Sequence, residues 1–487
     1  MYFDELIAAK LSREDGRAVI LGLGVSNLPL AVMLSKTPFA SKCEIRDDKS
    51  GEELASRAAP LGGRIKIIGG SDPCTGILRE GDMSGTLIFR SPGIRPDRGE
   101  LPECVRRGAT LTSEMECFCA STAGRIFAVT GSDGKTTTTT LTHLLLSRSP
   151  VNSRRLCRVG GNIGTPLLDC AGDFGTDDCA VLELSSFQLM TMSGPADFAA
   201  ITNITPNHLN WHTGMDEYIR AKYNVFGERT KRLVLNAKNG PARDAAELFT
   251  GHVSFFTAAN TPDDTFESLT GGRPESDLYY FDEGAIFRTD GKNREKILDR
   301  SDILLPGTHN VENYMTAIAL CGDYTDKDTI LDVARTFPGV EHRLEFVREK
   351  DGVKYYNSSI DSTPSRTAAA LSAVKGSTVV ICGGRDKHLS FLPLADALFE
   401  HSSAVVLTGE AAGQIDDAIR ERAATRSDGG ASLRVVKEPD FEEAVRKAAA
   451  LASPGESVIL SPACTSFDRF ANFEERGRLF KKTVALL

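Results

Sequence analysis

The feature that most constrains this fold is a repeated order of elements: a short apolar run, a glycine turn and a helical pattern. The stretch RIFAVTGSDGKTT at 125–137 has this order, and AVILGLG at 18–24 and STVVICGG at 377–384 begin it again. Apolar runs that alternate with helical patterns indicate strands joined by crossover helices, which makes the strands parallel. The sequence therefore predicts an α/β protein.

Chain length and punctuation divide this pattern into three domains. A chain of 487 residues exceeds what one hydrophobic core usually supports. The predicted domains are an N-terminal Rossmann-like domain, a central P-loop ATPase-like domain with a mostly parallel sheet, and a C-terminal Rossmann-like domain, at residues 1–121, 122–339 and 340–487. The first is expected to end in a strand-like piece at 109–118. Residues 239–305 read as irregular, apart from a hairpin-like piece with Asp-Glu-Gly at its turn.

Composition excludes several classes of protein. The net charge of -9, without a basic stripe, argues against a nucleic-acid surface. Eleven cysteines without a CxxC pair indicate reduced thiols. The start, MYFDELIAAK, lacks the features of a signal peptide, and no apolar run approaches the roughly 20 residues of a membrane helix. We expect a cytoplasmic monomer that binds no nucleic acid and does not insert into a membrane.

The turn TGSDGKTT at 130–137 has the parts of a phosphate-binding loop. A strand leads into it, Gly131 and Gly134 let backbone amides wrap an anion, and Lys135 supplies a cation. Thr136 offers a hydroxyl to Mg²⁺, and the following helix points its positive end at the phosphate. The alternative is a glycine turn followed by a surface lysine. The order of strand, Gly-Lys-Thr and helix favours the phosphate loop.

A second glycine turn, GLGVSN at 22–27, has part of a dinucleotide-binding fingerprint. Asn27 stands where the third glycine is expected, and Asp47 follows about 20 residues later, where a carboxylate would bind a ribose hydroxyl. A nucleotide cleft and a plain strand turn both remain open here. Together with a third glycine turn, CGGRDKH at 382–388, the pattern suggests an enzyme that uses ATP to join a nucleotide-borne substrate to another molecule.

Longer motifs in the chain resemble the Mur ligase family. Those similar to its central domain are GGNIGTP at 160–166, VLELSSFQL at 181–189, NITPNHLNWH at 203–212, YIRAKYNVF at 218–226 and LPGTHNVENYMTAIA at 305–319. Those similar to its last domain are HRLEFV at 342–347, GGRDK at 383–387 and SPACTSFDRFANFEERGRLF at 461–480. The resemblance runs across nearly the whole chain.

This resemblance implies the substrates and the reaction. ATP is expected to phosphorylate the terminal carboxylate of UDP-N-acetylmuramoyl-L-alanine. The amine of D-glutamate then attacks the acyl phosphate and forms a peptide bond, with ADP and phosphate as the other products. The pathway implied is peptidoglycan precursor synthesis. In such chemistry the protein supplies positioning and charge neutralisation.

The resemblance also implies roles for single residues around ATP. The expected ATP-binding residues are Gly131, Ser132, Asp133, Gly134, Lys135, Thr136, Thr137, Asn313 and Arg343. Two Mg²⁺ ions are implied, with ligands drawn from Thr136, Glu183, His208 and Lys222. Lys222 would serve as a lysine carbamylated by CO₂, against the alternative of an ordinary surface lysine. The expected catalytic residues are Lys135, His208 and Lys222.

The two other substrates have their own expected residues. Those for the UDP substrate are Ser26, Asp47, Ser91, Gly93, Asn162 and Ser186. Those for D-glutamate are Lys387, Ser466 and Phe473.

The chain departs from the family pattern at several positions. Ser358 and Ile360 stand where the family often has the aspartate and lysine of Asn-Asp-Ser-Lys. Asp361, three residues after Ser358, is a candidate substitute for that aspartate. Asn207 and Asn210 stand where aspartates commonly flank the metal-binding histidine.

Three other functions stay open. Another amino-acid ligase of the family, or a folylpolyglutamate synthase, would share many motifs, but the Asn-Pro-Arg signature expected of lysine- or diaminopimelate-adding ligases is absent from the sequence. A nicotinamide oxidoreductase built on GLGVSN is disfavoured by Asn27 and by the second phosphate loop. A nucleotide-binding homologue that has lost catalysis would account for Ser358.

Overall fold

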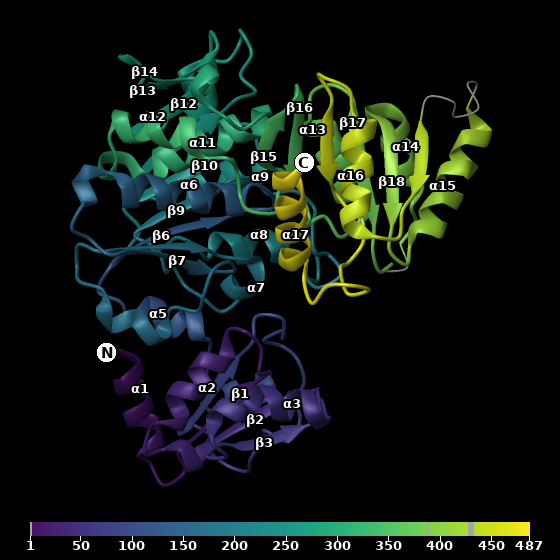
Figure 1. The fold of residues 1–487 in the computed structure, drawn as a ribbon. Helices are drawn as coiled ribbons and strands as arrows, with labels where there is room; N and C mark the ends of the chain where they lie inside the picture. The colour runs from purple at the N-terminus through teal and green to yellow at the C-terminus, as the bar shows by residue number, and fades with distance from the viewer. Residues whose placement is uncertain (1, 387–388, 427–432) are drawn as a thin grey trace. The chain divides into compact units, whose positions relative to one another are not determined.

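The computed structural model describes residues 2–386, 389–426 and 433–487, and it contains three β-sheets (Figure 1). The first two sheets lie in one compact unit, Met1–Asp302 with His309–Val333. The third lies in a second unit, Ile303–Thr308 with Ala334–Leu487. The predicted α/β class is confirmed. The domain boundaries at 121 and 339 stay predictions.

The N-terminal sheet is parallel throughout, in the order β3-β2-β1-β4-β5. Its strands are β1 (Arg17–Leu21), β2 (Cys43–Asp47), β3 (Lys66–Gly69), β4 (Thr86–Arg90) and β5 (Thr110–Thr112). Every residue of β1 and β4 is buried, as expected of central strands covered on both faces. Strand order reverses at β1, so the loops after β1 and β4 meet at the carboxyl edge, where such sheets bind ligands.

Helices flank this sheet. One of them lies where the sequence predicted a strand. They are α1 (Tyr2–Leu11), α2 (Asn27–Ser35), α3 (Gly51–Ala58), α4 (Leu101–Arg106) and α5 (Glu114–Ser121). The prediction of a strand-like piece at 109–118 was wrong beyond β5, because α5 begins at Glu114. Ser113 caps this helix by accepting a hydrogen bond from the Glu116 amide at 3.2 Å. The Ser-x-x-Glu capping pattern favours a helix here more strongly than the short alternation of residues favours a strand.

The central sheet has nine strands in the order β14-β13-β12-β11-β10-β9-β6-β8-β7. Its parallel part consists of β6 (Arg125–Thr130), β7 (Cys157–Gly161), β8 (Cys179–Glu183), β9 (Phe198–Ile201), β10 (Arg232–Asn236), β11 (His252–Thr257) and β12 (Ser276–Asp282). Strand β6 lies between β8 and β9. The loop after β6 therefore opens beside the carboxyl ends of both neighbours.

Helices of the central region place the functional side chains. They are α6 (Lys135–Arg148), α7 (Ser186–Leu189), α8 (Met215–Tyr223), α9 (Gly240–Arg243), α10 (Phe266–Thr270), α11 (Thr308–Cys321) and α12 (Lys327–Thr336). Helix α6 follows β6 after the four residues 131–134, and α7 follows β8 after two residues. The strand–loop–helix order predicted at 125–137 is confirmed.

The segment predicted to be irregular is more regular than expected. The hairpin is confirmed: β12 pairs antiparallel with β13 (Ala285–Thr289) across Glu283 and Gly284. Both turn residues have positive φ, 48° and 74°, as a two-residue type I′ turn requires. Two strands were missed, β11 and β14 (Arg294–Asp299). Strand β14 is mostly exposed and polar, so no hydrophobic pattern indicated it.

The C-terminal sheet has the order β15-β16-β20-β17-β18-β19. Its strands are β15 (Glu345–Lys350), β16 (Val353–Asn357), β17 (Thr378–Gly383), β18 (Ser402–Thr408), β19 (Arg434–Lys437) and β20 (Ser457–Leu460). Only β15 is antiparallel to its neighbour. One core cluster joins a face of the sheet to α13 (Pro364–Ala373), α14 (Leu392–His401) and α15 (Ala412–Thr425). Another joins the opposite face to α16 (Phe441–Leu451) and α17 (Phe473–Leu486).

Candidate active site

The loop between β6 and α6 has a backbone that suits glycine. Gly131 has a φ of 145° and Gly134 a φ of 78°, values that L side chains avoid. Space is also lacking, because a Cβ on Gly131 would collide with the Thr202 side chain and one on Gly134 with the Asn313 amide. The two glycines are therefore required by both conformation and packing.

The amides of this loop divide into two groups. Those of Ser132 and Asp133 donate to the backbone and side-chain oxygens of Asn203, at 2.8 and 2.9 Å. These two amides anchor the loop to the end of β9. The first amides of α6 form the positive end of the helix dipole. An anion would bind at this helix start, where Thr136 and the buried Thr137 also lie.

Lys135 lies across the loop. Its Nζ donates to the carbonyls of Gly131 and Ser132, each at 2.9 Å. The ammonium is thus held against the backbone of the loop predicted to bind a phosphate. Behind the loop, Asn313 of α11 accepts a hydrogen bond from Thr138 at 3.2 Å and is buried. The structure therefore brings Asn313 to the start of α6, and its contact with ATP stays a prediction.

Glu183 ends β8 and has the burial that a metal ligand would have. Its side chain is 1% exposed. One carboxylate oxygen accepts from Asn162 Nδ2 at 2.7 Å, and the other has no hydrogen-bond partner among the described residues. A buried carboxylate oxygen without a donor is costly unless a cation binds it. Oxygen donors of this kind are what Mg²⁺ prefers, so this carboxylate fits the implied ion.

Lys222 is buried rather than exposed, in contrast to an ordinary surface lysine. It is 1% exposed, and its Nζ donates to the Gly131 carbonyl at 2.6 Å. Burial, followed by repulsion from Lys135, lowers the pKa of this amine well below its usual value, although Asp133 and Glu183 oppose the shift. Burial therefore favours the neutral form of this amine more than in an ordinary lysine, within the electrostatic reach of the loop and of Glu183.

Helix α8 contacts the loop a second time through Tyr218, which the sequence did not indicate. Ser132 Oγ donates to the Thr205 carbonyl at 3.0 Å and lies 2.8 Å from Tyr218 Oη. Tyr218 and Lys222 are four residues apart and so share one face of the helix. This face is turned toward the phosphate loop.

His208 lies on the exposed loop after β9, in a left-handed conformation with a φ of 55°. Its ring packs edge-on against Phe187, with the centroids 4.9 Å apart. Among the described residues, His208 and Glu183 do not form a ready group of His, Cys, Asp and Glu ligands. The second metal site therefore stays a prediction.

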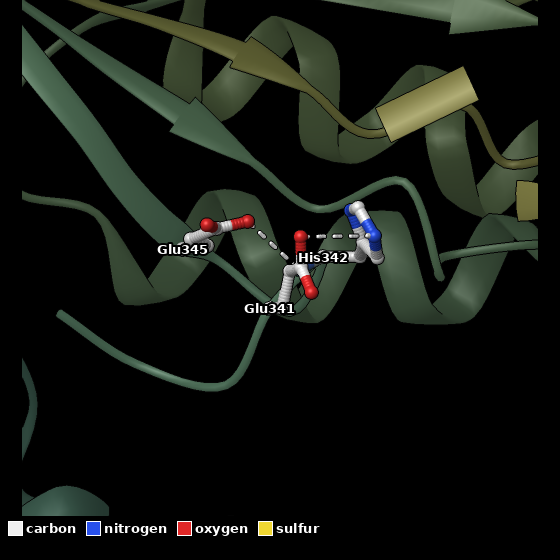
Figure 2. A group of neighbouring side chains, drawn as sticks. All are labelled: Glu341, His342 and Glu345. Carbon is white, nitrogen blue, oxygen red and sulfur yellow. Dashed lines mark hydrogen bonds and ion pairs between the residues drawn. The ribbon is translucent and has the colours of Figure 1, made fainter. Parts of the chain in front are cut away.

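One cluster in the described chain does bring such ligand atoms together: Glu341, His342 and Glu345 (Figure 2). One ammonium already pairs with both carboxylates, because Lys481 Nζ donates to Glu341 at 2.6 Å and to Glu345 at 2.9 Å. Asn357 Nδ2 further contacts His342 Nδ1 at 2.8 Å. Both carboxylates of the cluster are therefore already paired with an ammonium.

The backbone around Arg343, an expected ATP contact, has an unusual conformation. The residues on either side of it, His342 and Leu344, both have positive φ, 65° and 45°. Strained backbone of this kind persists only where surrounding contacts hold it. Here the Leu344 amide donates to Ser358 Oγ at 3.0 Å, and the Ile360 amide donates to the His342 carbonyl at 3.1 Å.

The side chain of Asp361 lies next to the Ser358 hydroxyl. Its carboxylate is 7% exposed and accepts from Ser461 Oγ at 2.9 Å. Burial raises the pKa of this carboxyl group, while hydrogen bonds from Ser358 and Ser461 and the charge of Arg343 lower it. A carboxyl group thus lies near both Ser358 and Arg343, and its role in place of an aspartate at position 358 stays a prediction.

The first-domain residues surround the loops after β1 and β4. Asp47 accepts a hydrogen bond from the Leu23 amide at 2.6 Å and so holds the glycine turn in its conformation. Asn27, which replaces the expected third glycine, donates to Ser91 Oγ at 3.1 Å. The structure brings Ser91 and the half-buried Ser26 to one edge of the sheet. The contact of Asp47 with a ribose stays a prediction.

The expected D-glutamate residues lie in the C-terminal unit, except that Lys387 is outside the described residues. Ser466 is buried, and Phe473 begins α17. Sequence reasoning missed Arg476, within the motif FEERG. It is 3% exposed and lines a small cavity with Gly383 and Gly384, and one of its nitrogens has no hydrogen-bond partner among the residues that the structure describes. Burial lowers the pKa of this guanidinium to about 10.

Comparison with known proteins shows which family the chain matches. The profile of the Mur ligase middle domain matches residues 129–321, and that of the Mur ligase glutamate ligase domain matches residues 342–464. The UDP-N-acetylmuramoylalanine–D-glutamate ligase of Ruminiclostridium cellulolyticum is 41% identical over 97% of both chains. That of Acetivibrio thermocellus is 40% identical over 97% of this chain and 96% of its own.

Solved structures share the fold at much lower identity. MurF from Acinetobacter baumannii superposes with a TM-score of 0.56 at 14% identity, over 98% of both chains. A UDP-N-acetylmuramate–alanine ligase from Thermotoga maritima gives 0.52 at 17% identity, over 96% of this chain and 99% of its own. With both domain profiles matched and relatives at about 40% identity over the full length, this chain belongs to the Mur ligase family.

Proposed function

We propose that this protein is an ATP-dependent ligase of the acid–D-amino-acid class, EC 6.3.2, that adds D-glutamate to UDP-N-acetylmuramoyl-L-alanine. The observation that carries the proposal is the likeness to ligases of that name over 97% of the chain. The structure supports the ATP half of the reaction through the phosphate loop and the partnerless oxygen of Glu183. The product would be a peptidoglycan precursor.

The reaction proceeds in two steps. The alanyl carboxylate attacks the γ-phosphorus of ATP, so that ADP leaves and an acyl phosphate forms. The amine of D-glutamate attacks the acyl carbon, inorganic phosphate leaves, and the amine gives up a proton. Lys135 and the first amides of α6 hold the phosphates and offset their charge, which is the main protein contribution to phosphoryl transfer.

Mg²⁺ would supply charge neutralisation between the β- and γ-phosphates. Thr136 and Glu183 are the proposed ligands of one ion, and His208 and Lys222 of a second. A free ammonium repels a cation, so Lys222 must change its charge to take this role. A neutral amine adds CO₂ and releases a proton, giving a carbamate with oxygen donors. The burial and lowered pKa of Lys222 favour this addition.

The remaining assignments follow the family resemblance. For the UDP substrate they are Ser26, Asp47, Ser91, Gly93, Asn162 and Ser186, and for D-glutamate Lys387, Ser466 and Phe473. Arg343 is the proposed ATP contact in the C-terminal unit. No helix in the described part of the chain combines the length and apolarity of a membrane span. We place the reaction in the cytoplasm and expect a monomer.

The test is phosphate release by the purified protein with ATP and Mg²⁺. Release should require both UDP-N-acetylmuramoyl-L-alanine and D-glutamate, and mass spectrometry should find the product heavier by one glutamyl residue. Equal turnover with L-lysine or meso-diaminopimelate would assign the protein to another ligase of the family. ATP hydrolysis independent of both substrates would contradict the ligase proposal.

A further inference from the structure

His212, on the loop between β9 and α8, lies at the centre of a chain of side-chain hydrogen bonds. The residue is 3% exposed. Its Nδ1 lies 2.9 Å from Glu217 Oε1, and its Nε2 lies 2.9 Å from Ser186 Oγ. The imidazole therefore bridges α8 and α7, two elements that are separate in sequence.

The direction of both hydrogen bonds follows from Glu217. This carboxylate accepts two hydrogen bonds from Arg95, each at 3.0 Å, and another from the Thr213 amide at 3.1 Å. An ionised carboxylate only accepts, so His212 Nδ1 has to donate to it. The other ring nitrogen then accepts the hydroxyl hydrogen of Ser186. One tautomer satisfies both partners.

These bonds link the elements that carry the proposed metal ligands. Ser186 begins α7 and stands three residues after Glu183, at the end of β8. Glu217 lies in α8, five residues before Lys222. The same helix contacts the phosphate loop through Tyr218. A shift of the imidazole would therefore move the two ligand-bearing elements relative to each other.

The N-terminal sheet joins this network through the segment that follows Gly93. Arg95 pairs with Glu217 and donates to the Trp211 carbonyl, and its guanidinium lies over the Trp211 ring, 5.0 Å from the centroid. Trp211 Nε1 in turn donates to the Gly93 carbonyl at 3.1 Å. The expected UDP-substrate loop is thereby tied to the same histidine loop.

Serine, histidine and a carboxylate in this order also occur in nucleophilic catalysis. That role does not suit this site, because Ser186 and His212 are each only 3% exposed. An acyl carbon could not approach the hydroxyl without displacing the surrounding side chains. The network is better explained as a device that positions its neighbours.

We propose that His212 is a positioning residue that holds the turn carrying Glu183 and the helix carrying Lys222 in register around the phosphate loop. The inference rests on the metal-ligand roles given to these two residues in the proposed function. It assigns His212 no contact with substrate, and its effect should appear in metal binding before any chemistry takes place.

Two substitutions separate the hydrogen bonds of His212 from its bulk. In His212→Gln the carboxamide can donate to Glu217 and accept from Ser186, as the imidazole does. In His212→Leu the volume is largely kept, and both hydrogen bonds are lost. The matched control is His143→Leu, which removes a half-buried histidine in α6 whose Nδ1 has no hydrogen-bond partner among the described residues.

The readout is Mn²⁺ binding in the presence of ADP, followed by electron paramagnetic resonance on the full chain. His212→Leu should weaken Mn²⁺ binding about tenfold, which is the scale of removing one partner from buried hydrogen bonds. His212→Gln and His143→Leu should stay within about threefold of wild type on the same scale. Ser186→Ala should weaken binding like His212→Leu, and the double variant should show no further loss.

Two results would overturn the inference: unchanged Mn²⁺ affinity in His212→Leu, or the same loss in His143→Leu. A fall in melting temperature without a fall in affinity would make His212 a purely structural residue and would equally contradict it. The proposed function is judged separately by whether wild-type turnover depends on D-glutamate. Its failure there would leave the comparison of Mn²⁺ affinities intact.

Discussion

At the scale of single residues, Lys222 and Glu183 are opposite charges buried beside one loop, yet they form no ion pair with each other in the described chain. Lys222 donates a hydrogen bond to the Gly131 carbonyl, and one Glu183 oxygen has no hydrogen-bond partner in the described part of the chain. Burial of both groups costs free energy that a folded chain retains only when something offsets it. A carbamate on Lys222, with Mg²⁺ beside it, would offset both.

Lys222→Ala should therefore lose nearly all ligase activity. Acetate or formate should partly restore turnover by supplying a carboxylate in the space left by the carbamate. Lys222→Arg should not be restored, because its bulk and permanent charge remain. The measurement is phosphate release with and without the added acid, and wild-type activity of Lys222→Ala in bicarbonate-free buffer would show that no carbamate is needed.

Asp361 and Ser358 define a second residue-scale prediction. Because the carboxylate of Asp361 lies against the Ser358 hydroxyl and near Arg343, we expect the charge to act from either position. Asp361→Ala should raise the KM for ATP about tenfold, the scale of losing one charge-assisted hydrogen bond. Adding Ser358→Asp to that variant should recover most of the loss. A double variant no better than Asp361→Ala would exclude the exchange.

At the scale of elements, α5 is joined to the central region by a buried carboxyl group. Glu114 Oε1 accepts the amides of Leu167 and Leu168, at 3.1 and 2.9 Å. Burial raises the pKa of Glu114 to about 7, although these two amides oppose the shift. The contact is therefore sensitive to pH near neutrality.

The sign of this effect follows from the raised pKa. The folded chain binds the Glu114 proton more tightly than the unfolded chain, so the contribution to stability is complete below the usual glutamate pKa. It falls as the pH rises from there to about 7, by about 3 kcal/mol in all. Glu114→Gln accepts the same amides without a charge.

We expect Glu114→Gln to stabilise the protein relative to wild type at about pH 8, and to have little effect at about pH 5, by this linkage. Urea unfolding at the two pH values measures the difference. Glu5→Gln, at an exposed position of α1, is the control and should show no such change. An equal effect of Glu114→Gln at both pH values would contradict the raised pKa.

At the scale of the whole molecule, ligand binding should be visible as stability. A ligand present at 100 times its Kd stabilises the folded state by about 2.7 kcal/mol. ADP with Mg²⁺ should raise the melting temperature by a few degrees, and EDTA should remove most of that rise. Lys135→Ala should abolish the shift. Wild-type stabilisation by ADP in that variant would place the nucleotide elsewhere.

Much of the fold could be predicted from the sequence, because α/β order and hairpin turns depend on residues that are neighbours in the chain. The hairpin at Glu283 and Gly284 needed only its turn chemistry. Strand β14 could not be predicted from the sequence, since it is mostly exposed and lies at the edge of the sheet, next to β13. In α5, a capping serine three residues before a glutamate decided against a strand.

The candidate site likewise has features that the sequence predicts and features that only the tertiary structure shows. The sequence by itself determined the phosphate loop, because glycine conformation, the lysine and the helix start are all local to 130–137. It also indicated Glu183, as a charge in an apolar strand. Only the tertiary structure decided that Lys222 is buried against Gly131, that one Glu183 oxygen lacks a partner, and that His212 bridges α7 and α8. The reason is physical: burial and hydrogen-bond partnership depend on segments far apart in the chain, and no local pattern records them.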